Sequence, residues 1–208
     1  KQISVIGSGM MGSGIAYASI MNGLEVLLID QNIEAAEAGK GKIETLLNES
    51  VKRKKLSEEE KTKLIGNVKT LSSLEKISGS DLVIEAVFEE LELKQSLYKK
   101  IEPYLKKNAI LASNTSTLPI TKLSEALQDS TRFIGIHFFS PVEKMNLVEI
   151  IKSKQSNEKS LAVALDYVSL LKKTPIVVND SRGFYANRCI IPYINEGLRM
   201  LSEGIEPA

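Results

Sequence analysis

Residues 1–30, KQISVIGSGMMGSGIAYASIMNGLEVLLID, decide the fold of this chain. Residues 2–6 are a short run with β-branched side chains that ends abruptly at a glycine-rich turn, residues 7–12. Small and apolar residues at helical spacing follow up to Gly23, which suits a helix C-cap. A second apolar run, residues 24–29, closes at Asp30. The pattern predicts strand, glycine turn, helix and strand, which together make a βαβ unit.

The turn has the spacing G-x-G-x-x-G at Gly7, Gly9 and Gly12. Gly7 permits a tight turn, Gly9 lets a pyrophosphate approach the N–H groups at the positive helix end, and Gly12 lets helix and strand pack closely. A glycine turn without a ligand is the simpler alternative, but the flanking strands and Asp30 favour a dinucleotide. Asp30 can accept hydrogen bonds from both hydroxyls of an adenine ribose. The next two residues offer no Arg or Lys for a 2′-phosphate, so NAD is favoured over NADP.

The composition is globular, with 43% hydrophobic and 25% charged residues among 208 and a net charge of +1. That charge gives no reason to expect nucleic acid or a membrane surface as a partner. No apolar run approaches the ~20 residues of a membrane span, and no signal peptide precedes the first strand. We therefore expect a cytoplasmic protein if the source is bacterial, and a protein of the mitochondrial matrix or peroxisome if it is eukaryotic.

Cys189 is the only cysteine, which excludes an internal disulfide and favours a reducing compartment. It lies in an apolar helical pattern, so we expect it to be buried rather than to act as a catalytic thiol. The chain begins almost inside a strand without a methionine and stops soon after an amphipathic segment. We expect it to be part of a longer polypeptide, although processing or the choice of the expressed piece would also explain its start.

Beyond residue 30, predicted helices and strands alternate. Residues 35–51 and 58–65 form a helical hairpin between strands, with Ser57 as the N-cap of its second helix. Its basic end, residues 52–55, is either a solvated face or a contact for a phosphorylated ligand. The further predicted strands are residues 68–71, 81–87, 109–112, 132–138, 147–151 and 176–178, and the further helices are residues 74–77, 91–105, 119–127, 158–172 and 184–202.

This order of elements predicts an α/β fold of the Rossmann type over residues 1–180, with a doubly wound, mostly parallel sheet. The last helix has apolar residues at helical spacing but no strand left to cover. We expect residues 181–208 to begin a second, α-helical domain that this chain does not complete.

In such a sheet, ligands bind outside the carboxyl ends of the strands, so polar residues that follow strands are candidates for the site. Glu89 follows the strand 81–87, and residues 113–117, SNTST, follow the strand 109–112. The hydroxyls of that run either line the site or only form turns and cap a helix. Lys94 lies near the start of a helix, where the dipole favours acids, and this mismatch favours a ligand role for its ammonium group.

His137 is the only histidine, and only an imidazole titrates near neutrality without a large pKa shift. It ends a predicted strand at the expected cofactor edge. Taken alone, a histidine among apolar residues is more often structural. Glu149 lies on the next strand, and an antiparallel hairpin of this length brings the two side chains together. A carboxylate on one ring nitrogen fixes the tautomer and stabilises the imidazolium, which leaves the other nitrogen free as a base.

A base beside NAD indicates oxidation of an alcohol, or the reverse reaction. His137 would take the hydroxyl proton as hydride leaves the same carbon, a contribution of about 10²–10⁴-fold in rate. Ser116, and Asn187 from the last helix, are candidates to hydrogen-bond the substrate oxygen. One histidine and one isolated cysteine give no zinc-ligand pattern, so we expect no catalytic metal.

Segments along nearly the whole chain carry a resemblance to a known family. They are GSGMMGSGIAY, the terminal Asp30, EAVFEELELK, SNTSTLPI, HFFSPVEKMNLVEII, KTPIVVND and GFYANRCIIPYINEGLRML. In this order they resemble the L-3-hydroxyacyl-CoA dehydrogenase family, and most of all the dehydrogenase portion of the multifunctional fatty-acid β-oxidation enzymes of the bacterial α-subunit type. The resemblance implies NAD-dependent oxidation of a (3S)-3-hydroxyacyl-CoA to a 3-oxoacyl-CoA.

The resemblance also implies roles for individual residues. His137 is the base with Glu149 as its partner, and Ser116 and Asn187 contact the substrate. The NAD contacts that it implies come from Gly7, Gly9, Met10, Met11, Gly12, Asp30, Val87, Phe88, Glu89, Lys94 and Ser116. The helical hairpin resembles the family's CoA-contacting element, with Lys54, or Arg53 one position earlier, as the CoA-binding cation.

Two features depart from the family pattern. Ser140 follows His-Phe-Phe where many members carry Asn, and we expect it to make a shorter polar contact on the nicotinamide side. Members also continue into a longer helical domain, which covers the acyl group and often supplies oligomer contacts. The resemblance and the start of the chain are consistent with an enoyl-CoA hydratase region before Lys1, which the sequence leaves open. For the full-length protein, the resemblance is also compatible with a homo-oligomer or with a complex that contains a thiolase.

Three alternative interpretations stay open. The first is a monofunctional 3-hydroxybutyryl-CoA dehydrogenase. The second is a dehydrogenase of the β-hydroxyacid or 6-phosphogluconate type, which uses a lysine where the last helix here offers Asn187 and Arg188. The third is a non-enzymatic, crystallin-like NAD-binding protein, against which the intact His137 and Glu149 argue.

Overall fold

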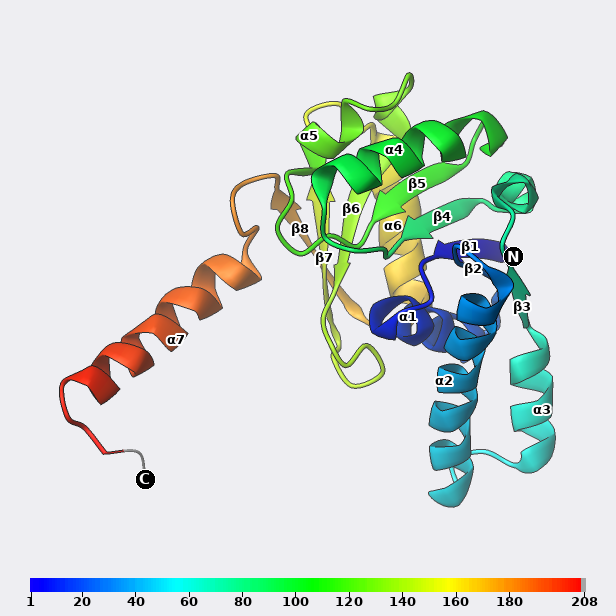
Figure 1. Cartoon of the computed structure of the whole chain (residues 1–208), viewed down its shortest axis with the longest axis horizontal. Helices are drawn as coiled ribbons and strands as arrows, with labels where there is room; N and C mark the ends of the chain where they lie inside the picture. The colour runs from blue at the N-terminus through cyan, green and yellow to red at the C-terminus, as the bar shows by residue number, and fades with distance from the viewer. Residues whose placement is uncertain (207–208) are drawn as a thin grey trace.

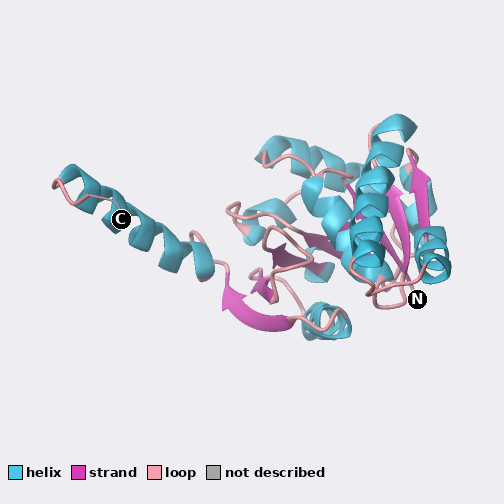
Figure 2. Cartoon of the chain, turned by 90° about the horizontal axis from the view of Figure 1, so that it is seen from below, coloured by secondary structure: helices cyan, strands magenta, loops and turns pink. Residues whose placement is uncertain are grey.

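The computed structural model describes residues 1–206, which form an eight-stranded sheet flanked by helices on both faces (Figures 1 and 2). The strand order is β3-β2-β1-β4-β5-β6-β7-β8. The β6–β7 pair is antiparallel, and the other neighbouring pairs are parallel. The predicted doubly wound, mostly parallel sheet is therefore confirmed.

The strands lie within a few residues of the predicted ranges. They are β1 (Gln2–Ile6), β2 (Glu25–Ile29), β3 (Val68–Leu71), β4 (Leu82–Glu85), β5 (Ile110–Ser113), β6 (Phe133–Phe138), β7 (Leu147–Lys152) and β8 (Thr174–Asn179). Strand β8 is longer than predicted because it pairs with β7 over six residues, although its burial pattern is mostly intermediate and exposed.

The helices are also close to their predicted ranges. The α-helices are α1 (Met10–Ile20), α2 (Ile33–Lys52), α3 (Glu58–Gly66), α4 (Leu91–Ile101), α5 (Ile120–Ser124), α6 (Glu158–Leu170) and α7 (Ala186–Ser202), and the 3₁₀ helices are η1 (Leu74–Gly79), η2 (Glu102–Tyr104) and η3 (Ser130–Arg132). Helix α4 stops before the predicted residue 105 because Pro103 has no N–H and cannot continue the α-helical ladder. Ser57 caps α3 in a capping box with Glu60, as the sequence predicts for that N-cap.

The sheet is buried on both faces by two separate hydrophobic clusters. Helices α1, α2 and α6 contribute to the first cluster, with Ile15, Ile43 and Val168 fully buried. Helices α4 and α5 contribute to the second, with Ile101 and Leu123 fully buried. A parallel sheet needs both faces covered, which explains why its strands read as continuous apolar runs.

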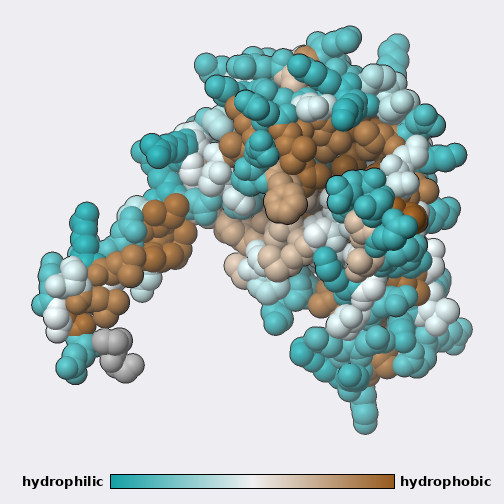
Figure 3. Space-filling view, in the orientation of Figure 1, coloured by the Kyte–Doolittle hydropathy of each residue, from teal (hydrophilic) through white to brown (hydrophobic). Residues whose placement is uncertain are grey.

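Helix α7 extends away from the sheet (Figures 1 and 2). Figure 3 shows an apolar stripe along it, to which exposed Ile190, Ile194 and Leu198 belong. The predicted burial of Cys189 is wrong: this thiol is exposed, because within residues 1–206 nothing packs over this part of the helix. The predicted division into domains at residues 180 and 181 stays a prediction. Within the same residues, no helix is both long and apolar enough to cross a bilayer.

Candidate functional site

The glycine turn lies at the carboxyl edge of the sheet, between β1 and α1. Gly7 has φ +98°, and a Cβ there would lie 2.6 Å from the carbonyl oxygen of Ala86. A Cβ on Gly12 would lie 1.7 Å from the carbonyl oxygen of Gly7, so both glycines are required by the fold itself. A Cβ on Gly9 would meet nothing within 4 Å. The space above Gly9 is therefore open for a ligand that approaches the backbone.

Helix α1 begins at this open space without a side-chain cap. Its N-cap residue is Gly9, which leaves the N–H groups of the first turn available to an anion. Met10 is 70% exposed there, Met11 is half-buried, and Ser140 Oγ lies 3.8 Å from Met10 Sδ. The contact brings Ser140, from the loop after β6, to the side of the turn that the sequence predicts for the cofactor.

Asp30 follows β2 at the same edge, where its carboxylate is held in place. Oδ2 accepts hydrogen bonds from the Ser8 backbone N–H at 2.7 Å and from Ser8 Oγ at 2.6 Å, and Oδ1 accepts one from Gln31 N at 2.8 Å. Partial burial alone would raise the pKa of Asp30, but these hydrogen bonds lower it below its usual value. The half-buried carboxylate stays ionised, and Oδ1 retains a lone pair for a ribose hydroxyl. With the open cradle at Gly9, these residues fit a dinucleotide such as NAD.

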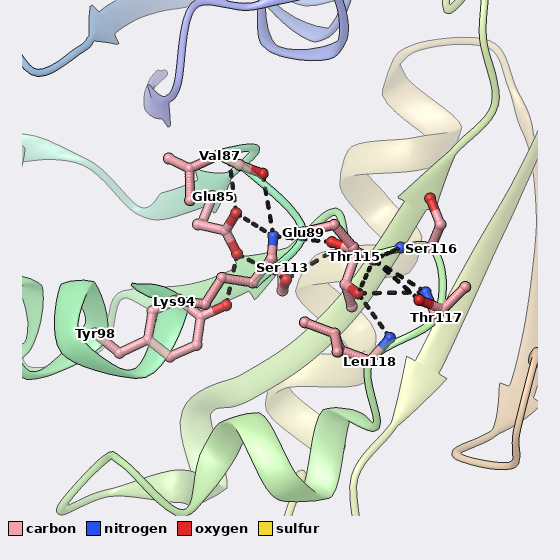
Figure 4. Close-up of polar contacts among 10 residues, drawn as sticks. All are labelled: Glu85, Val87, Glu89, Lys94, Tyr98, Ser113, Thr115, Ser116, Thr117 and Leu118. Atoms are coloured by element: carbon pink, nitrogen blue, oxygen red, sulfur yellow. Dashed lines mark hydrogen bonds and ion pairs between the residues drawn. The ribbon is translucent and has the colours of Figure 1, made fainter. Parts of the chain in front are cut away.

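A buried polar cluster lies beside the next two strand ends (Figure 4). Lys94 is only 1% exposed, and its Nζ lies 2.6 Å from Glu85 Oε1 and 3.3 Å from Glu89 Oε2. Tyr98 and Ser113 donate to the second oxygen of Glu85. Sequence reasoning selected Lys94 and Glu89, and Ser113 as part of the run 113–117, but it missed Glu85 and Tyr98. The available signal was an acid inside an otherwise apolar strand, followed by an unexplained lysine on the next helix.

Glu89 joins the loop after β4 to the loop after β5. Its Oε1 accepts hydrogen bonds from Thr115 Oγ1, Ser116 N and Thr117 N at 2.5, 2.7 and 3.1 Å. Burial alone would raise the pKa of Glu89, but the Thr115 hydrogen bond and the charge of Lys94 lower it. Val87 is half-buried and Phe88 is 85% exposed at the same edge. The residues predicted from this loop therefore lie together, and Phe88 offers an exposed apolar surface.

His137 and Glu149 face each other across the antiparallel β6–β7 pair, as predicted. His137 Nδ1 lies 2.8 Å from Glu149 Oε2, and both side chains are almost fully buried. Within residues 1–206, His137 Nε2 has no hydrogen-bond partner and no buried side-chain nitrogen or oxygen is unpaired, so Nε2 reaches the surface. The ring of Phe139 packs at a centroid distance of 4.4 Å from the imidazole. One ring nitrogen is thus held by an acid and the other is accessible.

Helix α7 begins at this pair. Glu149 Oε1 accepts hydrogen bonds from the backbone N–H groups of Tyr185 and Ala186 at 2.9 and 2.8 Å. Burial alone would raise the pKa of Glu149, but the His137 hydrogen bond and these two N–H groups lower it. The carboxylate therefore stays ionised at neutral pH and ties the imidazole to the start of α7.

Asn187 brings the loop after β5 to the same helix end. Its Nδ2 donates to the backbone oxygen of Ser116 at 2.9 Å. Asn187 and Thr117 line an open pocket of about 590 Å³ beside Gly183 and Arg188. The start of α7 thus contacts both Glu149 and Ser116. It connects the predicted general base and its carboxylate partner to the two predicted substrate contacts, Ser116 and Asn187.

The basic end of the helical hairpin borders a different cleft. Arg53 and Lys55 line this space of about 220 Å³, together with residues of α1 and the β6–β7 loop such as Tyr17 and Lys144. Lys54 is not part of that lining and occupies the turn after α2 with φ +55°. Of the two cations that the sequence leaves open for CoA, the cleft contains Arg53. Within residues 1–206, no cluster of three His, Cys, Asp or Glu side chains is arranged to hold a metal ion.

Comparison with known proteins places the chain among dehydrogenases. The family model described as "3-hydroxyacyl-CoA dehydrogenase, NAD binding domain" matches residues 2–181. The fatty acid oxidation complex subunit alpha of Pseudomonas entomophila is 37% identical over 206 residues, which are 99% of this chain and 29% of that protein. The chain therefore spans less than a third of the length of these curated relatives.

Solved structures give the same answer. The (S)-3-hydroxybutyryl-CoA dehydrogenase PaaH1 of Ralstonia eutropha has a TM-score of 0.95 and 37% identity, over 99% of this chain and 72% of that one. FadB2 of M. tuberculosis also has a TM-score of 0.95, with 32% identity over 99% of this chain and 73% of that one. The Rossmann sheet, the open glycine cradle and these matches agree, and the chain belongs to the 3-hydroxyacyl-CoA dehydrogenase family, of which it contains the NAD-binding domain.

Proposed function

We propose that the protein oxidises a (3S)-3-hydroxyacyl-CoA to a 3-oxoacyl-CoA with NAD, as a step of fatty-acid β-oxidation. The observation that carries this proposal is the 2.8 Å contact between His137 Nδ1 and Glu149 Oε2, which leaves Nε2 accessible. An imidazole oriented in this way is a general base for a hydroxyl proton. Relatives that are named for fatty acid oxidation and for 3-hydroxybutyryl-CoA oxidation support the choice of substrate.

In the proposed reaction, His137 Nε2 takes the proton from the C3 hydroxyl group of the substrate. Glu149 stabilises the imidazolium that forms, and the Tyr185 and Ala186 N–H groups keep that carboxylate in place. NAD, when bound, supplies the acceptor for the hydride. The Ser116 hydroxyl and the Asn187 amide donate to the C3 oxygen, which becomes the ketone oxygen of the product. In the reverse direction His137 returns the proton.

The cofactor is assigned to the cradle above Gly9. The N–H groups at the start of α1 would contact the pyrophosphate, and Asp30 would bind the adenine ribose. Exposed Met10 and Phe88 would contact the apolar faces of the cofactor, and Ser140 its nicotinamide side. Lys94 is buried, so its predicted effect on the cofactor would pass through Val87 and Glu89.

The CoA part of the substrate carries phosphates that need cations. We assign this contact to Arg53, because it lines the cleft between α1, α2 and the β6–β7 loop, whereas Lys54 does not. Arg53 is paired weakly with Glu49 at 3.7 Å on an exposed surface, so its guanidinium is available. The name "complex subunit alpha" of the relatives supports a partner subunit for the full-length protein.

The proposal is tested by acetoacetyl-CoA-dependent oxidation of NADH in the full-length protein. His137→Ala should lower kcat by about 10²–10⁴-fold and leave NADH binding unchanged, because the imidazole moves a proton and does not hold the cofactor. Phe139→Leu is the matched control, since it changes the packing around the ring but keeps the base. Unchanged turnover in His137→Ala would refute the assignment of the base, and the absence of NADH oxidation in the wild type would refute the proposed substrate class.

A further inference from the structure

Glu85 is a buried carboxylate with four hydrogen-bond donors. Oε1 accepts from Lys94 Nζ at 2.6 Å and from Val87 N at 2.8 Å. Oε2 accepts from Tyr98 OH at 2.6 Å and from Ser113 Oγ at 2.8 Å. The side chain is 0% exposed, and each oxygen already accepts two hydrogen bonds, so it has no capacity left for a ligand. Any effect of Glu85 on the reaction must therefore pass through its partners.

Lys94 is the partner that leads toward the site. Its ammonium group has three N–H donors, and three acceptors surround it: Glu85 Oε1 at 2.6 Å, Glu89 Oε2 at 3.3 Å and the carbonyl oxygen of Val87 at 3.4 Å. Figure 4 shows Lys94 between the two carboxylates. Two hydrogen bonds and one ion pair within the protein thus fix the ammonium group, and Lys94 in turn holds Glu89 and Val87 in position.

Glu89 in turn holds the segment that contains Ser116. Its second oxygen accepts from Thr115 Oγ1, Ser116 N and Thr117 N. The backbone oxygen of Ser116 is held from the other side by Asn187. Within the described residues, no hydrogen bond engages the Ser116 hydroxyl, and Figure 4 shows this side chain pointing away from the Glu89 contacts. The backbone of Ser116 is fixed, and its hydroxyl is left for another molecule.

We propose that Glu85 is a positioning residue that sets the direction of the Ser116 hydroxyl through Lys94 and Glu89. The inference rests on the proposed function, in which Ser116 contacts the C3 oxygen of the substrate. Without a full charge on Glu85, the Lys94 ammonium has one carboxylate left as partner and draws Glu89 toward itself. Glu89 then releases the N–H groups of Ser116 and Thr117, and the hydroxyl loses its fixed direction.

The test is a double-mutant cycle of Glu85→Gln and Ser116→Ala in the full-length protein. Glu85→Gln alone should lower kcat by on the order of 10²-fold, because displacing a substrate contact by about 1 Å has an effect of that size. The KM for NAD should change by a smaller factor than kcat, because Glu85 reaches the cofactor side only through Val87 N and, by way of Lys94, through Glu89. In the Ser116→Ala background the same change should have little further effect. Losses that multiply in the double variant would overturn the proposal.

Amide hydrogen exchange gives a second measurement that does not depend on turnover. Glu85→Gln should speed exchange at the Ser116 and Thr117 amides, whereas unchanged exchange there would overturn the proposal even if the enzyme proved inactive on 3-hydroxyacyl-CoA. Glu102→Gln is the matched control, because Glu102 accepts from Gln128 N and Asp129 N just beyond the opposite end of α4. This control should leave kcat and Ser116 exchange unchanged. If Glu85→Gln fails to fold, Tyr98→Phe removes one donor to the same carboxylate and should give a smaller change of the same kind.

Discussion

The two ends of the candidate site are built in different ways. At the cofactor end, the open cradle at Gly9 and the carboxylate of Asp30 both come from one βαβ unit, β1–α1–β2. At the catalytic end, His137, Glu149, Ser116 and Asn187 come from two strands, a loop and a helix that lie far apart in the sequence. The cofactor end depends on backbone N–H groups and on the absence of side chains. The catalytic end depends on hydrogen bonds between side chains, which form only after the sheet and α7 have come together.

This difference implies that a substitution at one end can abolish its function without affecting the other end. Glu149→Gln tests this independence and has the largest expected effect. An amide keeps the shape but presents the wrong hydrogen-bonding group to His137 Nδ1 and cannot stabilise an imidazolium. We expect kcat for acetoacetyl-CoA reduction to fall by about 10³-fold or more, by analogy with the acid of a hydrolase triad. NADH binding, measured by its fluorescence, should stay within about twofold. A parallel loss of NADH affinity would show that the two ends are coupled.

At the cofactor end, two glycine-to-alanine substitutions separate the glycine that leaves room for the ligand from the glycine that the fold requires. In Gly9→Ala the new Cβ meets no protein atom, so the protein should fold with an unchanged Tm but bind NAD at least about tenfold more weakly, equivalent to about 1.4 kcal/mol. In Gly12→Ala the Cβ would lie 1.7 Å from the Gly7 carbonyl oxygen, so unfolding free energy should fall by about 1–3 kcal/mol or more. Thermal melts and NAD titrations of both variants check this contrast. Equal losses of Tm in the two variants would contradict it.

The same contrast explains what the sequence could predict. The βαβ unit is local, so its glycines and Asp30 could be identified from spacing alone. The pairing of His137 with Glu149 was also predictable, because a hairpin of this length between adjacent antiparallel strands sets a register in which the two residues face each other. Glu85 was missed because a single acid in an apolar run does not reveal Tyr98 and Ser113 as its donors. Cys189 was predicted wrongly because helical spacing identifies an apolar face but not what covers it.

Acid sensitivity gives the smallest of these effects and tests whether Asp30 serves both the fold and the ligand. Its pKa is lower in the folded protein than its usual value of 3.8, because Ser8 and Gln31 hydrogen-bond the ionised form and outweigh partial burial. The unfolded state therefore binds the proton more readily. The stability that Asp30 contributes is complete above pH 3.8 and is lost as the pH falls through the folded pKa.

Asp30→Asn should accordingly reduce the loss of stability on acidification below about pH 4, measured by urea unfolding at several pH values. It should also weaken NAD binding and narrow the preference for NAD over NADP, because the ribose loses a charged acceptor and a 2′-phosphate is no longer repelled. Glu60→Gln is the matched control: the Ser57 hydrogen bonds lower the pKa of this capping-box carboxylate too, but it lies on α3. Both variants should lose less unfolding free energy than the wild type as the pH falls below about 4, and only Asp30→Asn should change cofactor binding. If Glu60→Gln weakened NAD binding equally, the effect at Asp30 would reflect general stability, and the cofactor end would not be the self-contained unit that its local sequence indicates.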